Sequence, residues 1–192
     1  MSESKKNIFV FDVESTSLHG KAFAVGVIVI DCNTGREVDH LLLKSKESEK
    51  DASDWVKQNV IPFLQNVPSV ETDKEMRDQF WALYQKYRKD SYIWADVAYP
   101  VETNFLEQVY GDDPAQREFE MPYPLHDIAD HLDAEIDRAN FSELSGVIKH
   151  DPYWDAKSSA YSLLRVRSNL MSDMGKKGDW ESIKEFSNQE FV

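Results

Sequence analysis

The sequence contains a single cysteine, Cys32, among 192 residues. One thiol excludes an internal disulfide and a metal site built from several cysteines, and it agrees with a reducing compartment. No run of about 18 apolar residues occurs, and the first six residues, MSESKK, lack the apolar segment of a signal peptide. We therefore expect a soluble, cytoplasmic protein that contacts no membrane.

Basic residues are also scarce, with 22 Lys and Arg against 35 Asp and Glu and a formal net charge of −13. This balance argues against a broad surface for polyanions, which is typical of basic domains. If nucleic acid is the substrate, we expect the protein to hold only a short length of it, with metal ions neutralising part of the charge. The acidic balance also permits a protein that mimics nucleic acid and blocks another protein.

The length and the 41 % apolar composition predict one domain, residues 1–192, with a core over about 7–170 and a tail, 171–192, that docks or stays flexible. Four consecutive apolar residues, Ile8 to Phe11, predict a strand buried on both faces at the centre of a sheet. A second strand is expected over residues 22–30. After a turn at 33–35, a third follows over 38–43, and the three run antiparallel.

The rest of the chain shows helical and strand patterns in turn. Helices are predicted over residues 56–64, with a kink or restart at Pro62, and over 72–89. A short buried strand at 92–95 precedes a helix from about 100 to 111. An edge strand at 121–126, a helix capped by Asp127, a helix opening after His150 and a small terminal helix around residues 180–186 complete the expected elements.

Two carboxylates follow the first strand, at Asp12 and Glu14. Alternate side chains of an extended chain point the same way, so both acids converge on one point. Two such charges side by side are costly unless a cation lies between them, and oxygen ligands of this kind suit Mg2+ or Mn2+. The alternative is a strand that ends in a polar turn with both acids solvated.

The segment 150–156, His-Asp-Pro-Tyr-Trp-Asp-Ala, carries the other chemical groups. Asp155 falls in the first turn of the late helix, where an anion is favoured, and His150 lies five residues earlier on the incoming loop. Either His150 is an ordinary loop histidine, or it shares a site with Asp155.

Together these segments resemble the DEDDh branch of the DnaQ-like 3′–5′ exonucleases, which have a ribonuclease H-like fold. Residues 11–18, Phe-Asp-Val-Glu-Ser-Thr-Ser-Leu, are similar to the first motif of that family and residues 150–155 to the third, and the resemblance spans about residues 7–170. It implies an α/β fold with a central mixed five-stranded sheet, three antiparallel strands first and helices on both faces. The third motif is most similar to a bacterial and phage exoribonuclease subgroup.

The middle motif of the family matches less closely. There an aspartate begins a helix just before a Phe-Leu pair, whereas this chain has Glu102-Thr103-Asn104-Phe105-Leu106. Asp96, at the end of the preceding strand, is the other candidate. We favour Asp96 because a side chain at a strand end is held more firmly than one on a first helical turn, and Glu102 remains the alternative.

The resemblance implies a site with two divalent ions, Mg2+ or Mn2+. Asp12 would bridge the ions, Glu14 and Asp155 would bind the one with the attacking water, and Asp96 or Glu102 would bind the second. His150 would accept the proton of the water, because an imidazole titrates near neutral pH.

The resemblance also implies substrate contacts at Ser15, Thr16 and Leu18, beneath the terminal nucleotide and its 3′-hydroxyl. Residues 156–177 contain five basic residues and one acid, beginning with Lys157. Their place directly after Asp155 favours contact with the phosphate backbone over an ordinary solvated helix face. Tyr153 and Trp154 either stack on bases or pack the helix start.

These expectations describe a two-metal 3′–5′ exonuclease that releases nucleoside 5′-monophosphates from single-stranded 3′ ends, with RNA slightly preferred over DNA. The resemblance also allows a homodimer. The alternative is a catalytically inactive ribonuclease H-like module that binds nucleic acid or regulates another protein. The imperfect middle motif favours that alternative, and the presence of His150 and the other acids argues against it.

Overall fold

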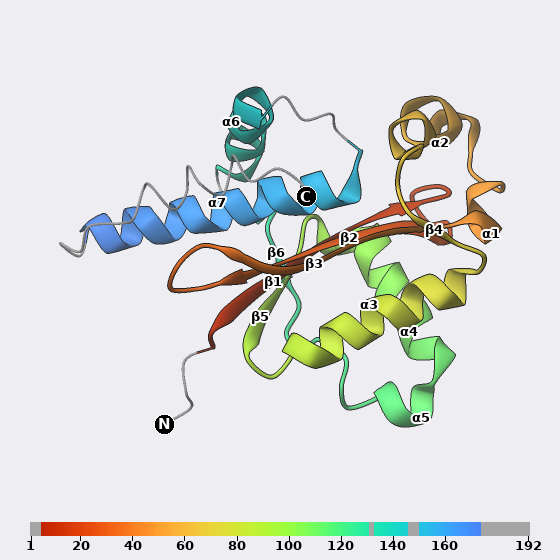
Figure 1. The fold of residues 1–192 in the computed structure, drawn as a ribbon, viewed down its shortest axis with the longest axis horizontal. Coiled ribbons are helices and arrows are strands. Elements are labelled where there is room, and N and C mark those ends of the chain that lie inside the picture. Colours follow the sequence, from red (N-terminus) through yellow and green to blue (C-terminus); the bar gives the residue numbers. More distant parts are fainter. Residues whose placement is uncertain (1–4, 131–132, 146–149, 174–192) are drawn as a thin grey trace.

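The computed structural model of the protein describes residues 5–130, 133–145 and 150–173, and its centre is one six-stranded sheet (Figure 1). In order across the sheet, the strands are β4 (Ser69–Val70), β3 (Glu37–Ser45), β2 (Ala22–Asp31), β1 (Asn7–Ser15), β5 (Ser91–Ala95) and β6 (His126–Asp127). The first three strands of the chain are antiparallel neighbours, whereas β5 runs parallel to β1, β6 to β5 and β4 to β3.

The predicted mixed sheet with three antiparallel strands first is confirmed, but it has six strands instead of five. The additional strand is β4, whose two residues pair with the end of β3. A two-residue strand has no periodic pattern, so it could not be predicted from the sequence. The edge strand expected over residues 121–126 corresponds to β6, which begins only at His126.

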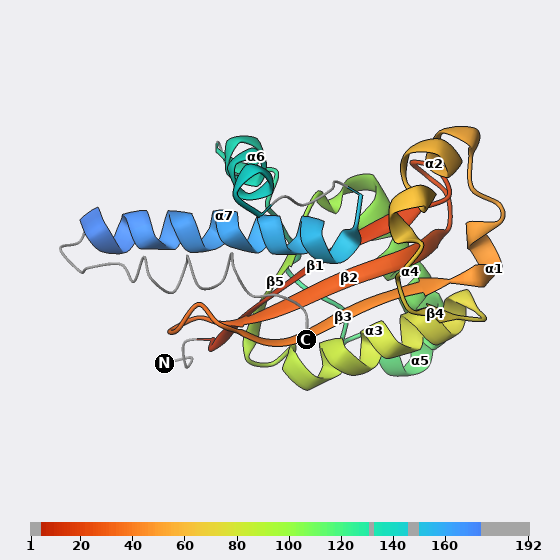
Figure 2. The same cartoon turned by 45° about the horizontal axis from the view of Figure 1, so that its top comes forward.

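Helices cover both faces of the sheet, as expected (Figures 1 and 2). One face packs against α3 (Asp73–Tyr87) and α4 (Thr103–Asp112), and the other against α6 (Ala134–Ser145) and α7 (Pro152–Asp173). The shorter elements are α1 (Lys46–Glu49), α2 (Asp54–Asn59), a 3-10 turn (Ile61–Leu64), a π-type turn (Ala98–Glu102) and α5 (Pro114–Arg117). Within the described ranges, no helix is long and apolar enough to cross a membrane.

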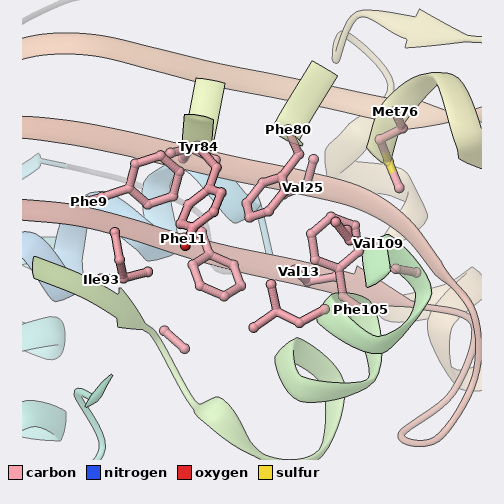
Figure 3. Close-up of a cluster of buried hydrophobic side chains, with 14 of the residues drawn as sticks. Phe9, Phe11, Val13, Val25, Met76, Phe80, Tyr84, Ile93, Phe105 and Val109 are labelled. Atoms are coloured by element: carbon pink, nitrogen blue, oxygen red, sulfur yellow. The ribbon is translucent and has the colours of Figure 1, made fainter. Parts of the chain in front are cut away.

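The alternation of side chains along β1 builds both halves of the core. Phe9, Phe11 and Val13 face α3 and α4, where they join an aromatic cluster (Figure 3). In that cluster the ring centroids of Phe80 and Phe105 lie 4.8 Å apart in an edge-to-face arrangement. Ile8 and Val10 point the other way, into the apolar face of α7. Because the period is two, Asp12 and Glu14 continue this second row and emerge beside α7.

The first turn of α7 approaches the sheet closely at Gly26 of β2. A Cβ atom at this position would lie 2.1 Å from the main-chain carbon of Pro152 and 2.1 Å from the main-chain nitrogen of Tyr153. Only glycine accommodates such an approach between two backbones. Gly26 therefore sets how deeply the start of α7, and the residues it carries, lie against the sheet.

Helix boundaries agree with the sequence in part. The break at Pro62 is confirmed, since α2 ends at Asn59 and a separate 3-10 turn contains the proline. The helix expected to begin at Asp127 was placed wrongly, because Asp127 belongs to β6 and α6 begins at Ala134. The predicted terminal helix around residues 180–186 lies outside the described residues.

Candidate active site

A cavity of about 650 Å3 opens where the parallel strands β1 and β5 end, beneath the start of α7. The carboxyl ends of these strands meet because Phe11 pairs with Ala95, and the main-chain N–H of Asp96 donates to the carbonyl of Phe11 over 3.0 Å. Six acidic side chains line the cavity: Asp12, Glu14, Asp96, Glu102, Glu135 and Asp155. The structure thus brings together every carboxylate expected at the site.

Of the two acids of β1, Asp12 is buried and Glu14 is half-buried. Burial raises the pKa of Asp12 well above its usual value, and the charges of Asp96 and Asp155 raise it further. Burial also raises the pKa of Glu14, and the nearby imidazole of His150 partly offsets this increase. Raised carboxyl pKa values mean that the protein pays to keep these groups charged without a cation.

Glu102 lies at the end of the π-type turn that follows β5, and its side chain is buried. Its carboxyl group interacts with the main chain of Val13 and with the carboxyl group of Asp12, which places it at the centre of the site. Burial, together with the charge of Asp96, raises the pKa of Glu102 to about 8. Its longer side chain thus reaches Asp12 from the helix start, as a metal ligand of the middle motif would need to do.

Asp96 lies in the same cavity but has other partners. Its Oδ1 accepts a hydrogen bond from a guanidinium N–H of Arg138 over 2.7 Å and another from the hydroxyl of Ser159. Arg138 comes from α6 and Ser159 from α7, so Asp96 connects the end of β5 to both helices.

His150 and Asp155 are joined at the start of α7. The main-chain N–H of His150 donates to Oδ2 of Asp155 over 2.9 Å, and Nδ1 of His150 lies 3.6 Å from Oε1 of Glu14. Burial and the charges of Asp96 and Glu14 raise the pKa of Asp155 to about 7. One ligand atom from each of Glu14, His150 and Asp155 lies within 4.8 Å of the others, which is close enough to surround one cation.

The donor set fits hard divalent cations. Mg2+ and Mn2+ prefer carboxylate oxygens, and here several buried carboxylates repel one another and have raised pKa values. A cation among them would remove that repulsion and favour their charged forms. Asp12, Glu14, Glu102 and Asp155 are the side chains that could hold such ions.

Of the residues expected to contact the substrate, one is exposed in the cavity and two are buried. Leu18 lines the cavity with 64 % of its surface exposed, so it can touch a ligand. Ser15 and Thr16 are buried and hold the turn after β1: the Ser15 hydroxyl donates to the carbonyl of Ser17, and Thr16 Oγ1 accepts from the N–H of Lys21.

The expectation for Lys157 needs a correction. Its side chain is fully buried against Tyr153 and Trp154, with Nζ 3.7 Å from Oε2 of Glu37 on β3. The Lys157 side chain faces the sheet because it follows Tyr153 by one helical turn. It therefore cannot reach a nucleic acid strand at the protein surface. Lys176 and Lys177 of the same basic stretch lie outside the described residues.

Arg138 and Tyr99 also line the cavity and received no role from the sequence. Tyr99 is an exposed aromatic residue in the π-type turn after β5. Exposed aromatic residues occur in many surface turns, so its position in the sequence did not indicate a role. Arg138 belongs to the helix whose start was placed wrongly. The sequence offered no signal that brings residue 138 to the end of β1.

The sheet order and the two helical layers define an α/β fold of the ribonuclease H-like type. Similar solved structures include the nuclease domain of 3′hExo, a DEDDh family member bound to rAMP (TM-score 0.55, 12 % identity, 88 % of this chain and 95 % of that one). A full-length 3′-exonuclease is comparable (TM-score 0.54, 12 % identity, 91 % and 85 %).

The E. coli ExoI–ssDNA complex in its zinc-bound form has a TM-score of 0.56 at 10 % identity, over 89 % of this chain. This chain spans 43 % of that larger protein. Neither protein-family models nor curated protein sequences give a match. The likeness at these identities establishes the fold.

Proposed function

We propose that the protein is a metal-dependent 3′–5′ exonuclease that hydrolyses single-stranded nucleic acid and releases nucleoside 5′-monophosphates. The observation that carries this proposal is the convergence of Asp12, Glu14, Glu102 and Asp155 with His150 on one cavity. These residues come from three separate parts of the chain, and a purely structural role would not require so much repulsion at one point. The shared fold with DEDDh exonuclease domains supports the same chemistry.

The four carboxylates would hold two Mg2+ or Mn2+ ions. When bound, such ions polarise the phosphoryl oxygens, lower the pKa of a water molecule and stabilise the leaving alkoxide. Asp12, at the centre of the group, is placed to contact both ions. Glu14 and Asp155 lie beside His150 and would hold the ion on the side of the attacking water.

His150 would accept the proton of that water. Its side chain is 38 % exposed, whereas that of Glu14 is 15 % exposed, so the proton can pass on to solvent. The carboxylates of Glu14 and Asp155 lie beside the imidazole and would stabilise its charged form. The hydrogen bond from its main chain to Asp155 fixes the loop on which the imidazole sits.

For the middle motif, the contacts support Glu102 over Asp96, which reverses our preference from the sequence. The carboxyl group of Glu102 interacts with that of Asp12, whereas Asp96 Oδ1 accepts hydrogen bonds from Arg138 and Ser159. An oxygen that already accepts two hydrogen bonds is a poor candidate for a metal ligand. Asp96 nevertheless remains close enough to raise the pKa values of Asp12 and Glu102.

The 3′ end of the nucleic acid would enter past Leu18 and Tyr99, two exposed apolar side chains that line the cavity. Bases stack on such surfaces with little sequence preference, which suits an enzyme that removes any terminal nucleotide. We keep the slight preference for RNA, which rests on the resemblance of the third motif. Neighbouring structures have been solved with rAMP and with ssDNA, so both sugars require testing.

The test is degradation of single strands labelled at the 3′ or the 5′ end, with RNA and DNA in parallel. We expect shortening from the 3′ end with Mg2+ or Mn2+, none with chelator, and faster loss of RNA. If no strand is cleaved while the protein still binds Mn2+, the catalytic proposal fails. The inactive nucleic-acid-binding module would then be the better description.

A further inference from the structure

The positive charge of Arg138 distinguishes it from the acidic residues that line the cavity. Among the described residues that line it, six are acidic, and Arg138 is the one lysine or arginine. A nucleic acid strand is a polyanion, and the formal net charge of the protein is −13. Metal ions would neutralise the carboxylates, but a strand also needs a group that attracts its phosphates.

The position of Arg138 is fixed on two sides. Its guanidinium donates to Oδ1 of Asp96 over 2.7 Å, and the same oxygen accepts the hydroxyl of Ser159. The preceding residue, Asp137, is fully buried and accepts the hydroxyl of Ser162 over 3.0 Å, which fastens α6 to α7. The arginine is therefore held at the wall of the cavity instead of extending freely into solvent.

A guanidinium has five N–H donors in a planar fork, and the contact with Asp96 uses the NH1 group. The Arg138 side chain is 22 % exposed and faces the cavity, so its other donors are within reach of a ligand there. Planar forks of this kind match the geometry of two phosphate oxygens. An arginine already oriented by a carboxylate loses little freedom when it binds.

We propose that Arg138 binds a phosphate of the nucleic acid strand in the cavity, and that Asp96 is a positioning residue that orients the guanidinium. The proposal rests on the proposed function, because it names a contact with the substrate of that site. It gives Asp96 a purpose other than metal binding. It also gives the described lining of an acidic cavity a cationic side chain that can bind a polyanion.

The test is binding of fluorescein-labelled ten-nucleotide strands to the full chain in Mg2+, in a His150→Ala background so that the strand survives. The comparison is between Arg138→Gln and Arg88→Gln. Arg88 lies on the other face of the sheet, is 20 % exposed, and pairs with Glu120, so its replacement removes a similar ion pair away from the cavity. Thermal unfolding of each variant checks that the fold is retained.

We expect Arg138→Gln to weaken binding about tenfold and to reduce the slope of log Kd against log salt concentration by about 0.7, the value for one phosphate contact on a single strand. Arg88→Gln should change neither. Arg138→Lys should restore the slope but not the full affinity, because a lysine keeps the charge and loses the fork.

A neutral methylphosphonate, moved along the strand, identifies the phosphate involved. At one position the substitution should weaken binding to the protein with Arg138 and have no further effect with Arg138→Gln. Asp96→Asn should weaken strand binding with Arg138 present, add nothing to Arg138→Gln, and bind Mn2+ no more weakly than the protein with Asp96. Glu102→Gln, in contrast, should lower Mn2+ affinity.

Equal affinity and equal salt slope for Arg138→Gln and Arg88→Gln would overturn the phosphate contact, even if the wild-type protein degrades strands as proposed. Loss of Mn2+ binding in Asp96→Asn would overturn the positioning role. If the wild-type protein neither binds nor shortens any strand, the proposed function fails first and this inference fails with it.

Discussion

The main-chain N–H of His150 donates to Oδ2 of Asp155 over 2.9 Å, so the proposed proton acceptor and a carboxylate of the site form one unit. His150 has a φ of 70°, in the left-handed region that only a few per cent of residues other than glycine adopt. Such strain at a functional position persists only when surrounding contacts enforce it.

Replacement of His150 by asparagine should separate chemistry from folding. Asparagine tolerates the left-handed conformation and keeps the main-chain donor, so the unfolding temperature and its increase with Mn2+ should change little. The single-turnover rate should fall about 100- to 10,000-fold, the usual contribution of a general base. A rate close to wild type would exclude His150 as the proton acceptor.

The acidic site predicts how stability depends on pH without metal. Glu102 and Asp155 have pKa values raised to about 8 and about 7, so the folded protein holds these protons more tightly than the unfolded chain does. This contribution to stability is complete below the unfolded pKa values and is lost as pH rises through about 7 and 8. In chelator, the unfolding temperature should therefore fall between pH 5 and 8.

Added Mn2+ should oppose this loss, because the ion binds the charged carboxylates and competes with protons. The metal-induced increase in unfolding temperature should be larger at pH 8 than at pH 6. Glu102→Gln should flatten the pH profile in chelator and reduce the response to Mn2+. A metal response that is independent of pH would contradict the proposed ligand set.

Replacement of Gly26 should reduce activity, although this residue touches no substrate. A methyl group there would meet the main chain of Pro152 and Tyr153, so Gly26→Ala must push the start of α7 away from the sheet. We expect a cost of about 1–3 kcal/mol in unfolding free energy. The rate should fall roughly 100-fold, because Asp155 and His150 move together.

Gly111 of α4 provides the matched control. A Cβ atom there meets nothing within 4 Å, and alanine favours a helix over glycine by about 1 kcal/mol. Gly111→Ala should stabilise the protein slightly and leave the rate unchanged. Equal rates for both alanine variants would show that α7 does not depend on the close approach at Gly26.

The buried pair of Lys157 and Glu37 predicts unequal effects of two substitutions. Burial lowers the pKa of Lys157, whose ammonium donates to the hydroxyl of Tyr153 over 3.3 Å. Lys157→Met removes the charge and fills the same space, so the unfolding free energy should change by less than about 1.5 kcal/mol. Glu37→Gln leaves the buried ammonium without its counter-charge and should cost roughly 3 kcal/mol.

Urea denaturation measures both substitutions, and strand binding gives an independent check. Lys157→Met should leave the salt dependence of binding unchanged, unlike Arg138→Gln. A reduced salt slope in Lys157→Met would restore the phosphate contact first expected from the sequence.

The parts of the fold that follow from local periodicity could be predicted. The apolar run before Asp12 defines the central strand, and the two-residue repeat places Asp12 and Glu14 on one side of it. Pro62 divides a helix because it has no N–H to donate. The pairing of β4 with β3 could not be predicted, since it depends on contacts between distant residues and spans only two positions.

The same distinction applies to the candidate site. His150, Asp155 and the acids of β1 stand in recognisable local patterns, and the structure brings them together. The orientation of Lys157 could have been predicted, because Lys157 follows Tyr153 by one turn on the face that packs against the sheet. The hydrogen bond between Asp96 and Arg138 could not have been predicted. It joins residues 42 positions apart, and Arg138 belongs to a helix whose start had no clear signal.

The central claim is tested most directly by the products from a 5′-labelled single strand incubated with Mg2+, wild type against Asp12→Asn. The claim predicts a ladder that shortens one nucleotide at a time from the 3′ end, with release of nucleoside 5′-monophosphates identified by mass spectrometry. Asp12→Asn should slow this at least about 1,000-fold, because it removes the carboxylate placed to contact both ions. Internal cleavage, nucleoside 3′-monophosphate products, or equal rates for the two proteins would contradict it.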